Sequence, residues 1–199
     1  KSISRKINSK NDKATEIVMG NGEVFSADQI ISTCGVVETE ELLNLKDSIK
    51  TGTEEGKFSI IETISVFEGK PQDYGWDETV IFFNENEHFR YEQPEGSIDL
   101  ASGVICLPEN YQDPANNSLD EARLRITNPA NFMLWDKLDE ASYLKEKEDC
   151  ESKMFERALS YLPNGKNQKN HFTDSILLKD TFTPRTIKKY TSHSNGALY

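Results

Sequence analysis

The side chains that could carry chemistry are few and scattered through the sequence. Three cysteines and three histidines lie far apart, with no CxxC and no spacing typical of a metal site: Cys34, Cys106, Cys150, His88, His171 and His193. The chain also lacks the GxGxxG, Walker, HExxH and GxSxG motifs. Its 34 acidic residues offer too many carboxylate pairs for one to be chosen as an acid–base pair. Motifs alone therefore predict no catalytic residue and no metal ligand.

Composition limits the class of protein. The 199 residues suffice for one large domain or two small ones, and the net charge of −11 argues against nonspecific nucleic-acid binding, which needs basic residues. Aromatic residues, at 10%, are enough for a packed core, and the apolar runs are too short to span a membrane. Separated cysteines, odd in number, predict a reduced, cytoplasmic protein. Both ends look cut, so we interpret the chain as a piece of a longer protein.

Turn signals and hydrophobic periodicity predict an α+β fold. Asn21-Gly22 favours a hairpin turn because both residues tolerate positive φ. We interpret residues 29–34, QIISTC, as a nearly continuous apolar strand of the kind that is buried on both faces of a parallel or mixed sheet. Residues 136–162 have helical spacing and are followed by Pro163. Strands are predicted at residues 15–19, 23–26, 29–34, 58–67, 78–83, 87–91, 103–107, 123–127 and 175–178, and short helices at 40–45, capped by Thr39, and 187–190, begun by Thr183-Pro184.

Two segments resemble FAD-dependent amine oxidases and carotenoid desaturases. Residues 22–33, GEVFSADQIIST, are similar to the hairpin that returns the chain to the dinucleotide-binding domain, and residues 37–43 also fit that family. Residues 180–190, DTFTPRTIKKY, followed by NGALY at 195–199, resemble the branch of phytoene desaturases, carotenoid isomerases and retinol saturases. YGWD at 74–77 and VICLP at 104–108 lie between them in the expected order. The resemblance therefore covers most of the chain.

This resemblance implies a fold and a cofactor. In that family an N-terminal GxGxxG binds the FAD pyrophosphate at a helix N-terminus, and this chain contains no such motif. The chain resembles the middle of the polypeptide, a single substrate-binding domain (1–199) with a mixed β-sheet, helices on one face, and residues 1–35 leading toward the missing FAD domain. FAD is expected in the full-length parent and not in this fragment. Because the flavin carries the hydride chemistry, the fragment alone is expected to be inactive.

The resemblance also implies roles for individual residues. The implied substrate is an apolar polyene or isoprenoid that the parent desaturates, saturates or isomerises, with the fragment supplying one wall of an apolar tunnel. The resemblance leaves open contact of the parent with a membrane surface and dimerisation through an exposed truncated face. For each residue set the alternative is structural: strand end, turn, helix cap or core. The implied cofactor contacts, in the parent only, are Ile3, Ser32, Thr33, Cys34, Asn195, Gly196 and Ala197, and the implied substrate contacts are Trp76, Phe82, Phe83, Phe132, Trp135, Thr183 and Arg185.

The sequence is also compatible with two other functions. One is a stand-alone α+β module that binds an apolar ligand or a protein partner. The other is a flavoenzyme of a related family, such as a polyamine oxidase. An upstream GxGxxG after a strand would favour a flavoenzyme, whereas a natural start at Lys1 and a natural stop at Tyr199 would favour the module.

Overall fold

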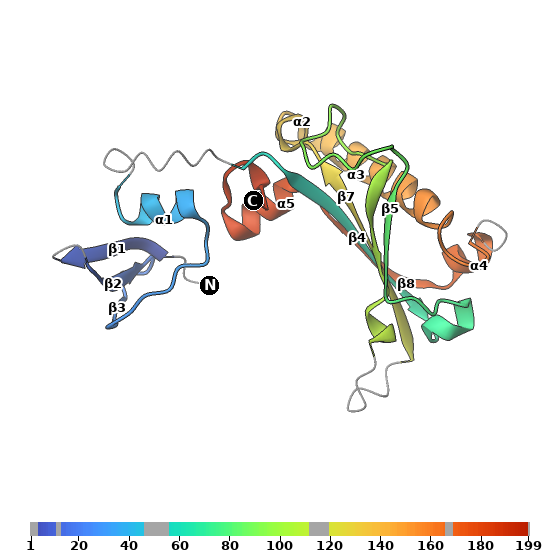
Figure 1. Ribbon diagram of the computed structural model, residues 1–199, viewed down its shortest axis with the longest axis horizontal. Coiled ribbons are helices and arrows are strands. Elements are labelled where there is room, and N and C mark those ends of the chain that lie inside the picture. Colours follow the sequence, from blue (N-terminus) through green and yellow to red (C-terminus); the bar gives the residue numbers. More distant parts are fainter. Residues whose placement is uncertain (1–3, 11–12, 46–55, 112–119, 166–168, 199) are drawn as a thin grey trace.

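The computed structural model describes residues 4–10, 13–45, 56–111, 120–165 and 169–198, so the predicted contact Ile3 lies outside the described residues. A three-stranded sheet near the N-terminus is followed by a five-stranded sheet with helices (Figure 1). This combination confirms the predicted α+β class. Within the described residues, no helix has the length and apolar character needed to cross a membrane.

The small sheet consists of β1 (Ser4–Lys10), β2 (Lys13–Met19) and β3 (Val24–Ser26), which pair antiparallel in that order. It confirms the predicted hairpin. The Met19 N–H donates to the Glu23 carbonyl at 2.8 Å, and Gly22 has a φ of 87° that suits glycine in the turn. The helix α1 (Val36–Leu42) packs against β1.

The strand predicted at residues 29–34 was wrong. This segment is irregular, and Ile31 is 88% exposed. An apolar run becomes a buried strand only where a neighbouring strand pairs with it, and no described strand does so here. The predicted cap was also wrong, because α1 begins after Gly35 and Thr39 lies inside it, where its hydroxyl donates to the Gly35 carbonyl at 2.5 Å.

The five-stranded sheet has the order β5-β6-β7-β4-β8. Its strands confirm five of the predicted ones, with bounds shifted by a few residues, whereas residues 87–91 are irregular. β5 ends at Asn84, whose side-chain oxygen accepts from the Asn86 N–H at 3.3 Å in a turn. The strands are β4 (Ser59–Glu68), β5 (Val80–Asn84), β6 (Ser102–Cys106), β7 (Glu121–Ala130) and β8 (Ile176–Phe182).

Every described pair of strands in this sheet is antiparallel, so the predicted mixed sheet was wrong. The reason lies in the connection between β7 and β8. The long helix α3 (Glu140–Ala158) carries the chain back over the sheet, so β7 and β8 run in the same direction. They do not pair with each other, because β4 lies between them and is antiparallel to both.

The helices lie mainly on one side of this sheet (Figure 1). The predicted helix 136–162 is divided: α2 (Phe132–Asp136) precedes α3, which begins where the Asp139 carboxylate accepts from the Ser142 N–H at 2.8 Å. Two short helices flank β8, namely α4 (Lys169–Asp174) and α5 (Pro184–Thr191), and α5 confirms the helix predicted from Thr183-Pro184. Single 3₁₀ turns occur at Pro71–Tyr74, Pro108–Asn110 and Ser194–Gly196.

The hydrophobic core fills the space between α3 and the sheet. From the helix it includes Met154 and Phe155, and from the sheet Phe67 and Leu124. Phe67 meets Trp76 edge to face, with ring centroids 5.2 Å apart. The core therefore buries one face of the sheet, and the other face lies at the surface.

Candidate functional site

The two faces of the five-stranded sheet differ sharply, as β4 shows. Alternate residues point to opposite faces, and those facing α3 are all buried: Ser59, Ile61, Thr63, Ser65 and Phe67. The residues between them are only half-buried, although three are large and apolar: Ile60, Ile64 and Val66. We call the surface that faces away from α3 the open face.

Strand register extends the open face across the whole sheet, because directly paired residues point to the same side. Phe82 pairs with Val104, Val104 with Thr127, Thr127 with Glu62, and Glu62 with Phe182. The next row contains Val80, Cys106, Arg125, Ile64 and Asp180 in the same order of strands.

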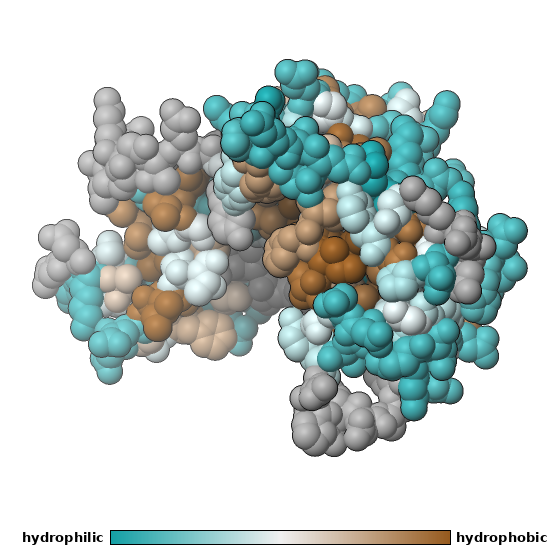
Figure 2. Space-filling view, turned by 45° about the vertical axis from the view of Figure 1, so that its right-hand side comes forward, coloured by the Kyte–Doolittle hydropathy of each residue, from teal (hydrophilic) through white to brown (hydrophobic). Residues whose placement is uncertain are grey.

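Apolar side chains on the open face are accessible. Phe82 is 79% exposed, and Leu178 and Phe182 are also exposed. The space-filling view shows hydrophobic residues gathered in a hollow on the larger part of the molecule, with hydrophilic residues around them (Figure 2). Phe82 lies on one edge strand and Leu178 and Phe182 on the other, so apolar side chains are accessible at both edges of this face. Exposed apolar surface on a folded domain marks a place where a ligand, a partner or another domain packs. The open face is therefore the candidate site.

One ion pair crosses the middle of the open face. The Arg125 Nε donates to the Glu62 carboxylate at 2.6 Å, and this bond raises the pKa of Arg125. Beside it, burial raises the pKa of the Cys106 thiol, which disfavours a reactive thiolate. The face can thus offer a ligand apolar side chains together with a few polar groups, namely Arg125, Glu62, Thr127 and Asp180. Its thiol, Cys106, is not activated as a nucleophile.

Among the predicted substrate contacts, Phe82 lies on the open face. Four others are buried in the interior, where Trp135 Nε1 donates to the Ser97 carbonyl at 2.9 Å: Trp76, Phe83, Phe132 and Trp135. Burial at this level favours a packing role for these four. The sequence identified large aromatic residues but not the side of the sheet on which each would lie.

Thr183 and Arg185 lie at the other end of the sheet, where β8 meets α3 and α5. Thr183 is buried, and its hydroxyl accepts from the Thr186 N–H as the cap of α5. The Tyr143 hydroxyl hydrogen-bonds that of Thr183 at 3.1 Å, and the Arg185 guanidinium lies over the Tyr143 ring at 4.3 Å from its centroid. The predicted cap agrees with this arrangement, and the role of Thr183 and Arg185 as substrate contacts stays a prediction.

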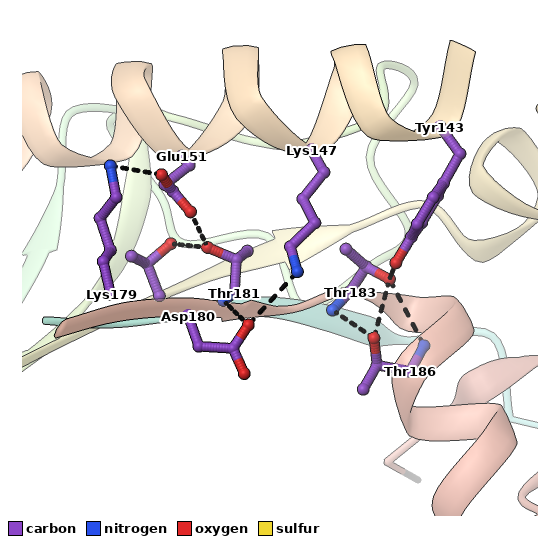
Figure 3. A network of polar contacts seen from close by, with 9 residues as sticks. Tyr143, Lys147, Glu151, Lys179, Asp180, Thr181, Thr183 and Thr186 are labelled. Carbon is purple, nitrogen blue, oxygen red and sulfur yellow. Dashed lines mark hydrogen bonds and ion pairs between the residues drawn. The ribbon is translucent and has the colours of Figure 1, made fainter. Parts of the chain in front are cut away.

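A polar network joins α3 to β8 beside this point (Figure 3). Thr181 donates to the Glu151 carboxylate at 2.6 Å and shares a hydrogen bond of 3.1 Å with Thr63. Lys179 pairs with Glu151 at 2.5 Å, and Lys147 pairs with Asp180 at 3.3 Å. The network fixes the edge strand β8 against the helix.

The two predicted cofactor segments approach each other, although about 160 residues separate them in the sequence. Glu38, just after Cys34, accepts from the Ser194 N–H at 3.0 Å and contacts His193 Nδ1 at 3.2 Å. Burial alone would raise the pKa of Glu38, but hydrogen bonds from Ser194, from its own N–H and from His193 outweigh it and lower the pKa. His193, which shows no acidic partner in the sequence, therefore gains one through the fold.

The described residues of these segments do not fit an FAD site by themselves. Ser32 hydrogen-bonds Thr39 at 2.6 Å, and Thr33 is exposed. At the other end, Gly196 is buried so closely against Phe132 and the Pro184 carbonyl that a Cβ would collide with them. Its neighbours Asn195 and Ala197 are half-buried and buried, so this glycine serves internal packing instead of approach to a ligand.

Metal binding finds no support in the described part of the chain, where no three His, Cys, Asp or Glu residues come together. No protein-family model matches the sequence. No curated protein matches it either. The resemblance to flavin-dependent desaturases thus stays a prediction.

Sequence reasoning missed residues that the register brings onto the open face, namely Val104, Ile64 and Arg125. The alternation of Arg123-Leu124-Arg125-Ile126 already indicated a half-exposed strand, so Arg125 could have been found. It also missed Tyr143 and Lys147, which contact β8 and α5. The spacing of Glu140, Tyr143 and Lys147 places them on one side of a helix, which is a signal that sequence reasoning could have used.

Proposed function

We propose that the chain is the substrate-binding part of an FAD-dependent oxidoreductase that acts on a polyene or isoprenoid by desaturation, saturation or isomerisation. The observation that carries the proposal is the open face, a surface across the five strands with accessible apolar side chains on both edge strands and the polar residues Arg125, Thr127 and Glu62 between them. A long hydrocarbon could lie across it, because ligand sites are lined mainly by apolar side chains with a few polar groups. In this role Phe82, Val104 and Ile64 form one wall of the substrate tunnel.

In this proposal, FAD binds to a part of the parent protein that lies outside this chain. The chain has no GxGxxG, and the segments around Cys34 and Gly196 do not cradle a pyrophosphate. The flavin would supply the hydride chemistry when bound in the parent. The residues of this chain would bind the substrate, orient it and exclude water, and none of them is assigned a catalytic role.

A retinol titration tests the substrate part of the proposal. Retinol is an uncharged polyene, and its fluorescence should rise and saturate as it binds the 199-residue chain. Phe82→Glu places a charge on the open face and should weaken binding by roughly tenfold, since burying an unpaired carboxylate is costly. Leu144→Glu is the matched control, because Leu144 is also an exposed apolar residue but lies on α3. Equal weakening by both variants, or no saturable binding, would contradict the proposal.

A flavin measurement separates the enzyme from a second candidate function, the stand-alone binding module. The module is favoured by one observation: side chains of this chain alone form a hydrophobic core between α3 and the sheet. The complete reading frame that contains this chain should be purified with FAD and its absorbance recorded. Bound flavin supports the oxidoreductase. Retinol binding without flavin in the complete protein supports the module, which would take an apolar ligand, a protein partner or a second copy of the chain.

A further inference from the structure

A second candidate site lies at the junction of α3, β8 and α5. A cavity of about 680 Å³ opens there between Tyr143 and Lys147 on α3, Phe182 at the end of β8, and Arg185 and Tyr190 on α5. Its size falls within the range of small-molecule sites. The cavity adjoins the open face at Phe182 and Asp180. It does not include Phe82, Val104 or Ile64, so the inference that follows does not depend on the proposed function.

The cavity carries a small excess of positive charge. Three basic residues line it, Lys147, Arg185 and Lys189, against two acidic ones, Glu140 and Asp180. The helix α5 carries three basic residues and no acidic one, in a chain whose net charge is −11. A local excess of cations on an acidic protein favours the binding of an anion at that place.

Two of these basic residues, Lys147 and Arg185, form long ion pairs that an incoming anion could replace. Lys147 pairs with Asp180 at 3.3 Å and Arg185 with Glu140 at 3.5 Å, whereas the Arg125–Glu62 pair on the open face is 2.6 Å long. The side chains of Lys147 and Arg185 are 27% and 32% exposed, against 62% for Asp180 and 73% for Glu140. The carboxylates are the better hydrated partners, so an incoming anion can replace them at small cost.

Arg185 is already oriented for this role. Its guanidinium lies over the Tyr143 ring, and the Tyr143 hydroxyl is fixed by Thr183. Its Nη1 donates to the Leu138 carbonyl at 3.4 Å and its Nη2 pairs with Glu140 at 3.5 Å, and both contacts are long. A guanidinium can bind two oxygens of a phosphate or carboxylate when such weak partners are replaced. The aromatic rings of Phe182 and Tyr190 supply apolar surface for the rest of the ligand.

We propose that this cavity binds a small organic phosphate, with its phosphate at Arg185, Lys147 and Lys189 and its apolar body against Tyr143, Phe182 and Tyr190. Three basic side chains suit the double negative charge of a phosphate monoester better than the single charge of a carboxylate. The apolar walls distinguish an organic phosphate from the inorganic ion.

Titration followed by NMR tests this site with defined probes. Phenyl phosphate added to the 199-residue chain should give saturable shifts of the Thr181, Arg185 and Thr186 amide signals. Arg185→Gln should weaken binding by roughly tenfold, since hydrogen bonds between charged groups are the strong ones. Lys147→Gln should weaken it as well. Lys153→Gln is the matched control, because Lys153 is a paired lysine on α3 that does not line the cavity, and it should leave binding unchanged.

Three further probes decide the ligand class. Benzyl alcohol, which is uncharged, should not bind. Inorganic phosphate and benzoate should each bind several-fold more weakly than phenyl phosphate. Equal binding of inorganic phosphate would overturn the role of the apolar walls, and equal binding of benzoate would overturn the choice of phosphate. Absence of saturable shifts, or binding that neither Arg185→Gln nor Lys147→Gln weakens while both variants keep the wild-type circular dichroism, would overturn the site itself.

Discussion

The covered face and the open face of one sheet are made by the same five strands, yet they have different physical roles. Neighbouring residues of β5 illustrate this: Phe83 is 7% exposed and stacks on Tyr161, while Phe82 is 79% exposed. On the covered face, apolar side chains stabilise the fold because α3 removes them from water. On the open face, side chains of the same type contribute little to stability and remain available for binding.

The largest expected effect compares these two phenylalanines. Phe83→Ala should lower the free energy of unfolding by about 3 kcal/mol, because it leaves a cavity in the core. Phe82→Ala should lower it by about 0.5 kcal/mol or less, as is usual for an exposed side chain. Urea unfolding followed by circular dichroism measures both. Equal losses would mean that the open face is covered in solution.

A smaller effect concerns the polar groups of the two faces. Thr63→Val removes the hydrogen bond to Thr181 on the covered face and should cost about 1 kcal/mol of unfolding free energy. Thr127→Val, on the open face, should change stability by less than about 0.5 kcal/mol. The same urea experiment applies, and a larger cost for Thr127→Val would show that the two faces had been assigned the wrong way round.

The ion pair on the open face is the next test. Arg125→Met leaves the Glu62 carboxylate without its partner on an apolar surface and should cost about 1 kcal/mol or less. The double variant Arg125→Met with Glu62→Met should recover that loss, because no charge is left unpaired. Thermal unfolding of the wild type, the single variant and the double variant decides this. A double variant less stable than the single one would contradict the explanation.

The smallest effect is a pH dependence at Glu38, which joins α1 to the C-terminal segment. Its pKa is lowered in the folded protein, so the folded state binds fewer protons than the unfolded state. The stabilisation is therefore complete above the ordinary value of 4.5 and is lost as the pH falls below it. Glu38→Gln should destabilise the protein near neutral pH, and its difference from the wild type should shrink as the pH falls from about 6 to about 3. A difference that is constant with pH would contradict this.

Sequence patterns predicted the parts of the fold that local chemistry determines. The Asn21-Gly22 hairpin and the cap at Thr183 depend on turn and capping preferences, and both were found. The exposed position of Ile31 and the antiparallel sheet could not be predicted, because they depend on which strands become neighbours. The same holds for the candidate sites. The open face exists only in the register of five strands, and the cavity at Arg185 requires α3 to pass beside a residue some 40 positions later in the chain.

The central claim is that the open face is the surface that binds an apolar ligand, and photolabelling tests it most directly. A long-chain hydrocarbon carrying a diazirine group would be irradiated with the chain, and the labelled residues would be identified by mass spectrometry. We expect labels on Phe82, Val104 and Ile64, and we expect excess retinol to remove them. Labels that spare these three residues and collect instead on exposed apolar residues of other elements, such as Leu144 on α3, would contradict the claim.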